Sequence, residues 1–396
     1  MLDERFSAAH AQLRTIATTG TNGKTTTTSM IAAIVAASGE RSARLTTLGA
    51  WVGDDLIPAP TPSEEFLACV ERAVAAGVRT LALEVTSKAL GDGIARRWRP
   101  NVAVFTNLTR DHFDMHRSAE AYLAAKAQLF MALVAGDTAI LNADDAASEL
   151  LCEVIAPGVI VQTFSVRTAD ATLAARTVEL QPGSTRAVLA PSQFAGELGG
   201  VLELAITGGV HAQNALAAAL AARAAGYSAA AIVGGLEGFR GVPGRFEVIG
   251  GRPLVVVDYA HTPDGLVGTL ATARELCGGR VICVFGCGGD RDRGKRPEMA
   301  AVVDQRADLA ILTTDNPRHE DPAAIARDVL AGAPEPRARW IVEPDRAHAI
   351  ELAIAQARHD DVVVIAGKGH ERVQEVAGRE LAFSDAEVAS GAIARR

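Results

Sequence analysis

Short apolar segments alternate with longer, Ala-rich amphipathic segments along most of this 396-residue chain. Short apolar runs are typical of buried strands, and the segments between them have the periodicity of helices. Because such alternation is the pattern of parallel sheets covered by helices, the sequence predicts an α/β fold. The expected strands are 14–20, 80–85, 101–107 and 138–142 in the first part, and 254–258, 281–285, 309–313, 339–342 and 362–366 in the second.

The alternation is interrupted once, between residues 159 and 206, by short β-like segments separated by turns. This segment predicts a small antiparallel β subsheet within the first domain. A Gly- and Pro-rich stretch at 238–253 is typical of a linker, and the strand–helix pattern restarts after it. We therefore expect a parallel-sheet domain at 1–244 and a Rossmann-like domain at 245–396. The expected helices of the first domain are about 24–38, 118–135, 144–155, 212–226 and 228–238.

Charge and cysteine usage narrow the class of protein. The net charge of −8 and the absence of a basic run argue against a nucleic-acid partner. No apolar run reaches the length of a membrane span, and the N-terminal residues do not resemble a signal peptide. Five scattered cysteines without a CxxC pair are typical of a reduced, cytoplasmic protein. The sequence leaves open whether the chain is a monomer or a homodimer.

The segment TGTNGKTT, residues 19–26, follows an expected strand and opens an expected helix. In this context a Gly-rich loop and a helix N-terminus cradle phosphate groups, a lysine reaches the terminal phosphates, and the next hydroxyl ligates Mg²⁺. Lys24 and Thr25 occupy those two positions. The general motif has Gly where this chain has Thr18, so a simple glycine turn that caps a helix is the alternative. We predict an ATP-binding domain of the phosphate-loop type.

Lysine is scarce: five lysines stand against thirty-four arginines. Where a chain that prefers Arg keeps Lys, the site can require a compact point charge or an amine that loses its proton. Four of the five lie in Gly-rich or polar segments, while Lys126 lies on an expected helix. The alternative is a coding bias with random survivors, and for Lys126 an ordinary solvated helix residue.

Two further segments follow expected strands at the sheet edge where α/β proteins place their ligands. Glu84 ends the strand at 80–85, where a metal ligand, a helix cap or an ion pair with Arg would all fit. The segment TNLTRDHFDMH, residues 106–116, brings Asp111, His112, Asp114 and His116 together. Such a cluster favours a ligand or acid–base role for His112 over that of a simple loop histidine.

Several segments, in order and at matching spacings, resemble the Mur ligase family, and within it the MurE branch. That branch adds the third amino acid to UDP-N-acetylmuramoyl-dipeptide. The resemblance covers residues 14 to about 390. It rests on GTNGKTTT, EVTS, TNLTRDHFD, AKAQLF, ILNADD, QNALAA, GRFE, VDYAHTPD, GCGGDRDRGKRP, TTDNPRHEDP and GKGHE.

The resemblance implies an ADP-forming ligase with ATP and Mg²⁺ as cofactors. A substrate carboxylate attacks the γ-phosphate of ATP, and an amine then displaces phosphate from the acyl phosphate to form an amide. Lys24, Glu84, His112 and Lys126 are implied as catalytic, with Thr25 and Glu84 on one Mg²⁺, and His112 and a CO₂-derived carbamate on Lys126 near a second. The implied nucleotide contacts are Gly20, Thr21, Asn22, Gly23, Lys24, Thr25, Thr26, Asn214, Arg245, Asp258, Tyr259 and His261.

The resemblance also implies where the amine substrate binds. The set is Arg291, Asp315, Asn316, Arg318, Gly367 and Glu371. Arg318 is typical of members that use meso-diaminopimelate, whose distal carboxylate a guanidinium can clamp, and Glu371 can pair with the distal ammonium. Lys295 and Lys368 flank this set. The alternative for Arg318 is a surface ion pair after a turn.

The carboxylate-substrate segments depart from the family pattern. The phosphate loop begins so early that we expect no room for the N-terminal uridine-nucleotide domain. The family's Thr-Thr-Pro is Pro60-Thr61-Pro62 here, its Ser-Ser-His after Glu84 is Thr86-Ser87-Lys88, and its Gln-His-Arg element is not recognisable. His211 replaces the usual Asn near Asn214. We expect Thr61, Thr86, Ser87 and Lys88 to face the acceptor.

Three functions follow as hypotheses. The first is an ATP-dependent ligase that joins a diaminopimelate-like amino acid to a small-molecule carboxylate other than the UDP-linked muramoyl dipeptide. The second is the standard MurE reaction, UDP-N-acetylmuramoyl-L-Ala-D-Glu:meso-diaminopimelate ligation in peptidoglycan synthesis. The third is a non-catalytic ATP-binding subunit. Folate polyglutamate synthesis is a weaker enzymatic alternative, because the DNPR and GKGHE segments do not belong to it.

Overall fold

The computed structural model describes residues 8–59, 61–111, 116 and 118–396. The chain divides into two units. Unit 1 comprises residues up to Thr109, Ser118–Glu179 and Ser184–Arg240, and unit 2 comprises Arg110–Arg117, Leu180–Gly183 and Gly241–Arg396. The main boundary falls at Arg240, inside the stretch that the sequence predicts as a linker.

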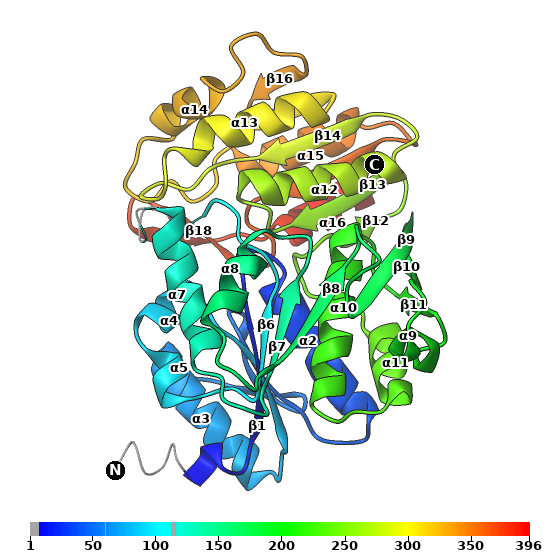
Figure 1. The fold of residues 1–396 in the computed structure, drawn as a ribbon. Coiled ribbons are helices and arrows are strands. Elements are labelled where there is room, and N and C mark those ends of the chain that lie inside the picture. Colours follow the sequence, from blue (N-terminus) through cyan, green and yellow to red (C-terminus); the bar gives the residue numbers. More distant parts are fainter. Residues whose placement is uncertain (1–7, 60, 112–115, 117) are drawn as a thin grey trace. The chain divides into compact units, whose positions relative to one another are not determined.

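Unit 1 is built on one sheet in the order β11-β10-β9-β8-β7-β6-β1-β5-β2-β3-β4 (Figure 1). Its strands are β1 (Arg14–Thr19), β2 (Ala43–Thr46), β3 (Gly49–Val52), β4 (Asp55–Ile57), β5 (Thr80–Glu84), β6 (Val102–Phe105), β7 (Thr138–Asn142), β8 (Ile160–Ser165), β9 (Leu173–Gln181), β10 (Ser184–Leu189) and β11 (Val201–Leu204). Its helices are α2 (Lys24–Ala37), α3 (Pro62–Ala75), α4 (Ser87–Gly91), α5 (Ile94–Arg97), α7 (Ala119–Met131), α8 (Ala147–Val154), α9 (Gln193–Glu197), α10 (Gly209–Ala224) and α11 (Ala229–Gly238).

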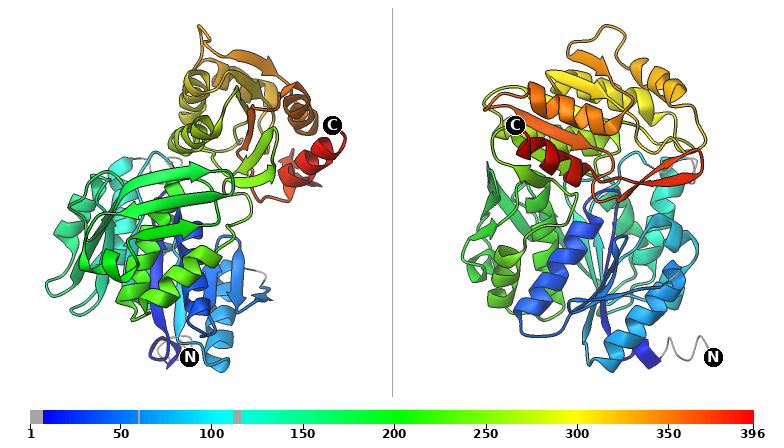
Figure 2. Two further views of the ribbon diagram at one scale, coloured as in Figure 1. Left: turned by 90° about the vertical axis from the view of Figure 1, so that its right-hand side faces the viewer. Right: turned by 180° about the vertical axis from the view of Figure 1, so that it is seen from behind.

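Strand β1 lies at the centre of the parallel part of this sheet, between β5 and β6. Helices α2, α10 and α11 pack together on one face, and α3, α4, α7 and α8 cover the other. Figure 2 shows the same layers from two further sides. Because β1, β5 and β6 run in the same direction, the loops after their carboxyl ends come together at one edge of the sheet.

The segment 159–206 refines the sequence-based expectation. Strands β10 and β11 are antiparallel, as expected, but they do not form a separate sheet. Strand β8 pairs parallel to β7 and thereby continues the main sheet, and β9 follows it. Strands β2–β4 and helix α3 were not predicted; the three strands are only three or four residues long, too short to show a clear alternating pattern.

Unit 2 contains a six-stranded sheet in the order β12-β13-β17-β14-β15-β16, parallel except for the edge strand β12. Its strands are β12 (Glu247–Gly250), β13 (Leu254–Asp258), β14 (Val281–Phe285), β15 (Leu309–Leu312), β16 (Arg339–Val342) and β17 (Val362–Ala366), with the separate hairpin β18 (Val373–Val376) and β19 (Arg379–Ala382). Its helices are α12 (Pro263–Leu276), α13 (Lys295–Arg306), α14 (Pro322–Leu330), α15 (Arg346–Gln356) and α16 (Asp385–Ala394).

Helices α12, α13 and α14 cover one face of the unit 2 sheet, and α15 and α16 cover the other. The central strands are buried along their whole length, which is why they read as continuous apolar runs rather than alternating ones. The α/β prediction and the five strands expected in the second domain are confirmed.

Candidate active site

The phosphate loop, residues 20–26, connects the carboxyl end of β1 to the amino end of α2. Gly20 and Gly23 have φ angles of 149° and 84°, which favour glycine. A Cβ atom on Gly20 would lie 1.8 Å from the Thr106 hydroxyl, and one on Gly23 would lie 2.4 Å from Asn214 Oδ1. No capping side chain occupies the start of α2, so its N-terminal N–H groups remain suited to an anion.

The segment after β6 holds this loop in shape. The Thr21 amide donates to the Asn107 carbonyl at 2.8 Å, and the Asn22 amide donates to Asn107 Oδ1 at 2.9 Å. The Thr106 hydroxyl donates to the Asn22 carbonyl at 2.6 Å. The loop is therefore ordered by its protein neighbours before any ligand binds. Sequence reasoning did not assign Thr106 or Asn107 to the site.

Lys24 and Thr25 both form hydrogen bonds with neighbouring protein groups. Lys24 Nζ donates to the Thr21 carbonyl at 2.7 Å, so the ammonium lies over its own loop. The buried Thr25 hydroxyl donates to Glu84 Oε2 at 2.8 Å. Because Thr18 pairs with Glu84 in the β1–β5 register, this carboxylate stands at the same sheet edge as the loop.

A hydroxyl beside a carboxylate is a donor set that suits Mg²⁺, which prefers hard oxygen ligands. Thr47, which the sequence did not single out, also serves Glu84: its amide donates to Glu84 Oε2 at 3.1 Å. In the described part of the chain no three His, Cys, Asp or Glu side chains gather as a metal site. His112 lies outside the described residues.

Lys126 is fully buried, so it is not the solvated helix residue of the alternative interpretation. Its Nζ atom donates to the Gly20 carbonyl at 2.6 Å and lies 4.2 Å from the centroid of the Tyr122 ring. The amine therefore contacts the phosphate loop directly. The carbamate on Lys126 stays a prediction, because an unmodified ammonium makes the same contact.

Asn214 also contacts the phosphate loop. Its side-chain oxygen accepts a hydrogen bond from the Thr27 hydroxyl at 3.3 Å and lies against Gly23. Helix α10 thus brings a residue that is distant in sequence to the start of α2, and the contact of Asn214 with a nucleotide stays a prediction. Thr26 is buried within α2 beside these contacts.

The residues predicted to face the acceptor have structural contacts of their own. Thr61 begins α3 as its N-cap and accepts from the Glu64 amide at 3.3 Å, and Thr86 caps α4 by accepting from the Ala89 amide at 3.2 Å. Ser87 is buried, whereas Lys88 is exposed and lies 3.4 Å from Asp92. These caps explain the two threonines without a substrate, so their contact with an acceptor stays a prediction.

In unit 2, the predicted nucleotide residues gather at the end of β13. Asp258 accepts hydrogen bonds from the Phe246 and Ala260 amides and from the Thr269 hydroxyl at 2.6, 2.8 and 2.9 Å. Burial raises the pKa of this carboxyl, and the three hydrogen bonds oppose the rise. Asp258 therefore anchors the turn after β13, and its contact with a nucleotide remains a prediction.

Tyr259 lies within a group of cationic and aromatic side chains. The Arg245 guanidinium carbon lies 4.1 Å from the Tyr259 ring centroid, and the His261 and His370 rings lie at 4.6 and 5.3 Å. Burial raises the pKa of the Tyr259 hydroxyl. The group presents flat aromatic and guanidinium surfaces of the kind that stack on a base.

The predicted amine site comprises Arg291, Asp315, Asn316, Arg318, Gly367 and Glu371, and the structure brings these segments together within unit 2. A Cβ on Gly288 would lie 3.1 Å from Arg318 Nη1 and 3.7 Å from Arg291 Cγ, so the two arginines meet at that glycine. A Cβ on Gly367 would lie 2.6 Å from Asp315 Oδ2. Asn316 Nδ2 donates to Glu371 Oε2 at 2.8 Å.

Arg318 forms the ion pair that the alternative interpretation expected, although its side chain is only 20% exposed. Its Nε atom lies 3.1 Å from Glu375 Oε2, and its Nη1 atom donates to the Gly289 carbonyl at 2.8 Å. Its backbone has a left-handed φ of 52°, held by hydrogen bonds to the hairpin residues Glu375 and Ala377. The pair with Glu375 thus orients the guanidinium toward Gly288.

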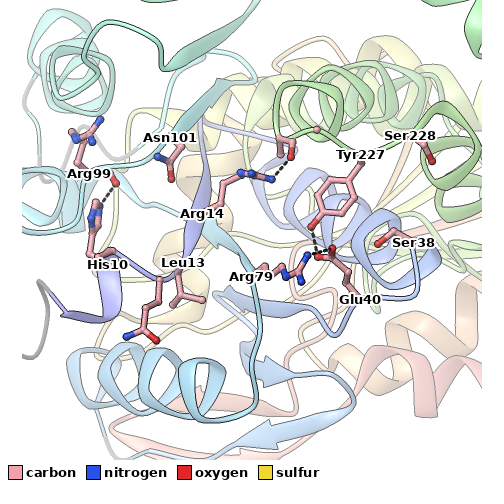
Figure 3. A pocket seen from close by; sticks show the side chains of 14 residues that line it. His10, Leu13, Arg14, Ser38, Glu40, Arg79, Arg99, Asn101, Tyr227 and Ser228 are labelled. Atoms are coloured by element: carbon pink, nitrogen blue, oxygen red, sulfur yellow. Dashed lines mark hydrogen bonds and ion pairs between the residues drawn. The ribbon is translucent and has the colours of Figure 1, made fainter.

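A pocket of about 810 Å³ lies at the opposite, amino-terminal edge of the unit 1 sheet (Figure 3). None of the predicted site residues lines it. Arg14 donates to the Ala225 carbonyl at the end of α10, and Arg99 pairs with Asp137. Tyr227 contacts Thr80 and Glu40. Because protein groups satisfy these side chains, we place the chemistry at the other edge.

Burial raises the pKa of Cys283 and of Cys287 to about 12. In the described residues, no helix has the length and apolar character needed to cross a membrane.

The phosphate loop with its threonine–carboxylate pair, followed by a second α/β unit with a separate polar site, defines an ATP-dependent ligase of two substrates. The chain belongs to the Mur ligase family. The model of the Mur ligase middle domain matches residues 18–222, and that of the Mur ligase, glutamate ligase domain matches residues 244–369. Members of this family are ATP-dependent, ADP-forming ligases.

Similar curated proteins agree on one branch of the family. The UDP-N-acetylmuramoyl-L-alanyl-D-glutamate–2,6-diaminopimelate ligase of Geobacillus kaustophilus is 40% identical over 100% of this chain and 82% of its own length. The ligase of that name from Xanthomonas campestris pv. campestris is 41% identical over 100% of this chain and 80% of its own length.

Solved structures of related ligases have a similar fold. A structure with that ligase name has a TM-score of 0.66 at 34% identity and covers 100% of this chain and 83% of its own. Folylpolyglutamate synthase of Mycobacterium tuberculosis has a TM-score of 0.73 at 20% identity, and the match covers 99% of this chain and 95% of the synthase. At this identity the likeness is one of fold alone.

Proposed function

We propose that this chain catalyses the MurE reaction, which joins 2,6-diaminopimelate to the D-glutamyl carboxylate of UDP-N-acetylmuramoyl-L-Ala-D-Glu in peptidoglycan synthesis. The observation that carries the proposal is the identity of about 40% over the whole chain to ligases with that name. This reaction is the second of the hypotheses drawn from the sequence. The comparisons support it better than the first hypothesis, in which the acceptor is a carboxylate other than the UDP-linked dipeptide.

In the proposed reaction the acceptor carboxylate attacks the γ-phosphorus of ATP, and ADP leaves. The amine of diaminopimelate then attacks the acyl carbon, and inorganic phosphate leaves as the amide forms. The charge that develops on the transferring phosphoryl group needs fixed cations and donors. Lys24 and the N-terminus of α2 would supply them, together with Mg²⁺ bound by Thr25 and Glu84. The contact of Lys126 with the Gly20 carbonyl places this amine at the phosphate loop, where its proposed carbamate would lie near a second Mg²⁺.

The amine site favours a substrate with a second carboxylate. Arg318, oriented by Glu375, offers a guanidinium for that carboxylate, while Glu371 offers an acceptor for an ammonium. Diaminopimelate carries both groups at its distal end, whereas lysine carries only the ammonium. We therefore expect diaminopimelate to be preferred.

The test is phosphate release by the purified chain with ATP, Mg²⁺, UDP-N-acetylmuramoyl-L-Ala-D-Glu and meso-diaminopimelate, with the product identified by mass. Product formation with diaminopimelate and not with lysine is the expected result. Activity with diaminopimelate only on carboxylates that lack the UDP-linked dipeptide would instead establish the first hypothesis. The exposed Lys88, which stands where the family has His, is the observation that favours that outcome.

A further inference from the structure

Lys368 lies between Gly367 and the turn that leads to Glu371, and its side chain has no solvent exposure. Its Nζ atom donates to Asn316 Oδ1 at 2.9 Å, to Glu371 Oε2 at 2.8 Å and to the Val373 carbonyl at 2.7 Å. An ammonium has three protons, and here each has a protein acceptor. The hydrogen-bonding capacity of the ammonium is therefore satisfied by protein groups alone.

Two of the three acceptors belong to the predicted amine site. Asn316 can present either its oxygen or its NH₂ group to a neighbour, but Lys368 only donates and ionised Glu371 only accepts. The oxygen of Asn316 must therefore face Lys368 and its nitrogen must face Glu371, as the structure has it. The amide of Glu375 also donates to Asn316 Oδ1 at 3.0 Å, which completes this side of the amide.

Glu371, Asn316 and Arg318 each keep a polar group or hydrogen that these protein contacts do not use. In the described residues, the hydrogen bonds of the Glu371 carboxylate both fall on Oε2, which leaves Oε1. Asn316 Nδ2 uses one of its two hydrogens for Glu371. Arg318 uses Nε and Nη1, and within the described residues its Nη2 forms no hydrogen bond or ion pair. Glu371 Oε1 thus remains as an acceptor, and N–H groups of Asn316 and Arg318 remain as donors, for a substrate that carries both charges.

We propose that Lys368 is a positioning residue for the amine substrate: its buried ammonium fixes the orientation of Asn316 and Glu371 and so sets the affinity for diaminopimelate. This inference rests on the proposed function. Lys368 is not a proton acceptor in the reaction, because its three protons are held by three fixed groups and it contacts substrate only through others. Arginine cannot replace it, since a planar guanidinium with five donors does not fit a fully enclosed site with three acceptors.

The experiment separates the two half-reactions in Lys368→Met and Lys368→Arg. Acyl phosphate formation is measured without amine, as ADP release with hydroxylamine as the trap, and amide formation is measured against diaminopimelate concentration. We expect the KM for diaminopimelate to rise about 10- to 100-fold, because hydrogen bonds to charged groups are lost. The rate of acyl phosphate formation should stay within about twofold of the parent. Arg is expected not to rescue the KM.

Arg280→Met is the matched control for lost stability. Arg280 pairs with Asp361 at 2.7 Å at the amino-terminal edge of the unit 2 sheet, away from the amine site. It should lower the melting temperature and leave the KM for diaminopimelate unchanged. If Lys368→Met does not fold, Lys368→Gln, which keeps two donors, should show a smaller rise in KM.

An unchanged KM in the folded Lys368 variants overturns the inference, as does a loss of acyl phosphate formation in step with amide formation. A parent protein that forms no acyl phosphate with the UDP-linked dipeptide overturns the proposed function instead, so the two failures are distinguishable.

Discussion

The phosphate loop of unit 1 comes from one continuous stretch, residues 20–26, whereas the amine site of unit 2 draws its side chains from the separate segments around Arg291, Asn316 and Glu371. Glycine φ angles and backbone hydrogen bonds shape the loop, and the side chains of Thr106 and Asn107 brace it from a distant segment. A buried ammonium and a buried side-chain amide shape the amine site. The difference teaches that a site whose glycines and charged groups are neighbours in sequence can be predicted locally, while the side-chain contacts that complete either site depend on the fold.

Substitutions at the two sites should also change different kinetic constants. Loss of a group at the phosphate loop removes the charge stabilisation on which phosphoryl transfer depends, so it should lower kcat. Loss of a group at the amine site should raise the KM for one substrate and leave acyl phosphate formation intact. The following variants test whether this separation holds.

Lys24→Met tests the phosphate-loop side and should have the largest effect. It removes the ammonium that lies over the loop, and we expect acyl phosphate formation to fall about 10²- to 10³-fold or more. ADP release in the presence of hydroxylamine measures it. Arg186→Met, which removes an exposed arginine of the same unit, is the control and should retain the parent rate. Equal activity in the two variants would show that Lys24 has no role in phosphoryl transfer.

Lys126→Arg tests whether the amine is needed for its chemistry rather than for its charge. Arginine keeps a cation but cannot add CO₂, so we expect a loss of about 10- to 100-fold, comparable to the loss of a group that supports a metal site. Incubation with ¹³C-bicarbonate should give a carbamate resonance in the parent that is absent from Lys126→Arg. A fully active Lys126→Arg would contradict the carbamate.

Arg318→Lys tests the amine side. Lysine keeps the charge but loses the planar set of donors that Glu375 orients, so the KM for diaminopimelate should rise about tenfold. Acyl phosphate formation should not change, which separates this variant from Lys24→Met. Arg372→Lys, on an exposed ion pair of the same unit, is the matched control. A fall in kcat without a change in KM would break the distinction between the sites.

The phosphate loop, the strands around it and the five strands of unit 2 could be predicted because their signals are local. Gly20, Gly23, Lys24 and Thr25 are neighbours in sequence, and short apolar runs mark the strands. The contact between Thr47 and Glu84 could not be predicted, because the hairpin that carries Thr47 consists of short, partly exposed strands.

The hydrogen-bond network around Lys368 could not be predicted from the sequence for a related reason. Asn316 lies 52 residues before Lys368, and no periodicity links them. The scarcity of lysine was the available signal: it singled out this position as one that Arg does not fill, but not the three groups that the ammonium contacts. Burial of Lys126 was likewise invisible in the sequence, because α7 has Ala on several sides and no clear polar face.

The smallest expected effect concerns stability, and it checks that unit 2 can be weakened without a change at the amine site. Glu320 accepts from the fully buried Arg296 at 2.8 Å, and these bonds lower the pKa of its carboxyl to about 2. Because the folded pKa lies below the ordinary value of 4.5, the ion pair stabilises the fold above about pH 4.5. This contribution is lost as the pH falls from about 4.5 toward 2.

Glu320→Gln should therefore lower the free energy of unfolding at neutral pH, by about 2 kcal/mol, because the buried guanidinium keeps its desolvation cost and loses a charged partner. The melting temperature, followed by circular dichroism from pH 7 to pH 2, should differ from the parent at pH 7, and the difference should shrink below about pH 4.5 and nearly vanish as the pH approaches 2. Glu380→Gln, on the exposed strand β19, should match the parent throughout. If the melting temperature of Glu320→Gln differed from that of the parent by the same amount at every pH, Glu320 would act through packing rather than through its charge. A raised KM for diaminopimelate in this variant would show that stability and substrate affinity in unit 2 are coupled.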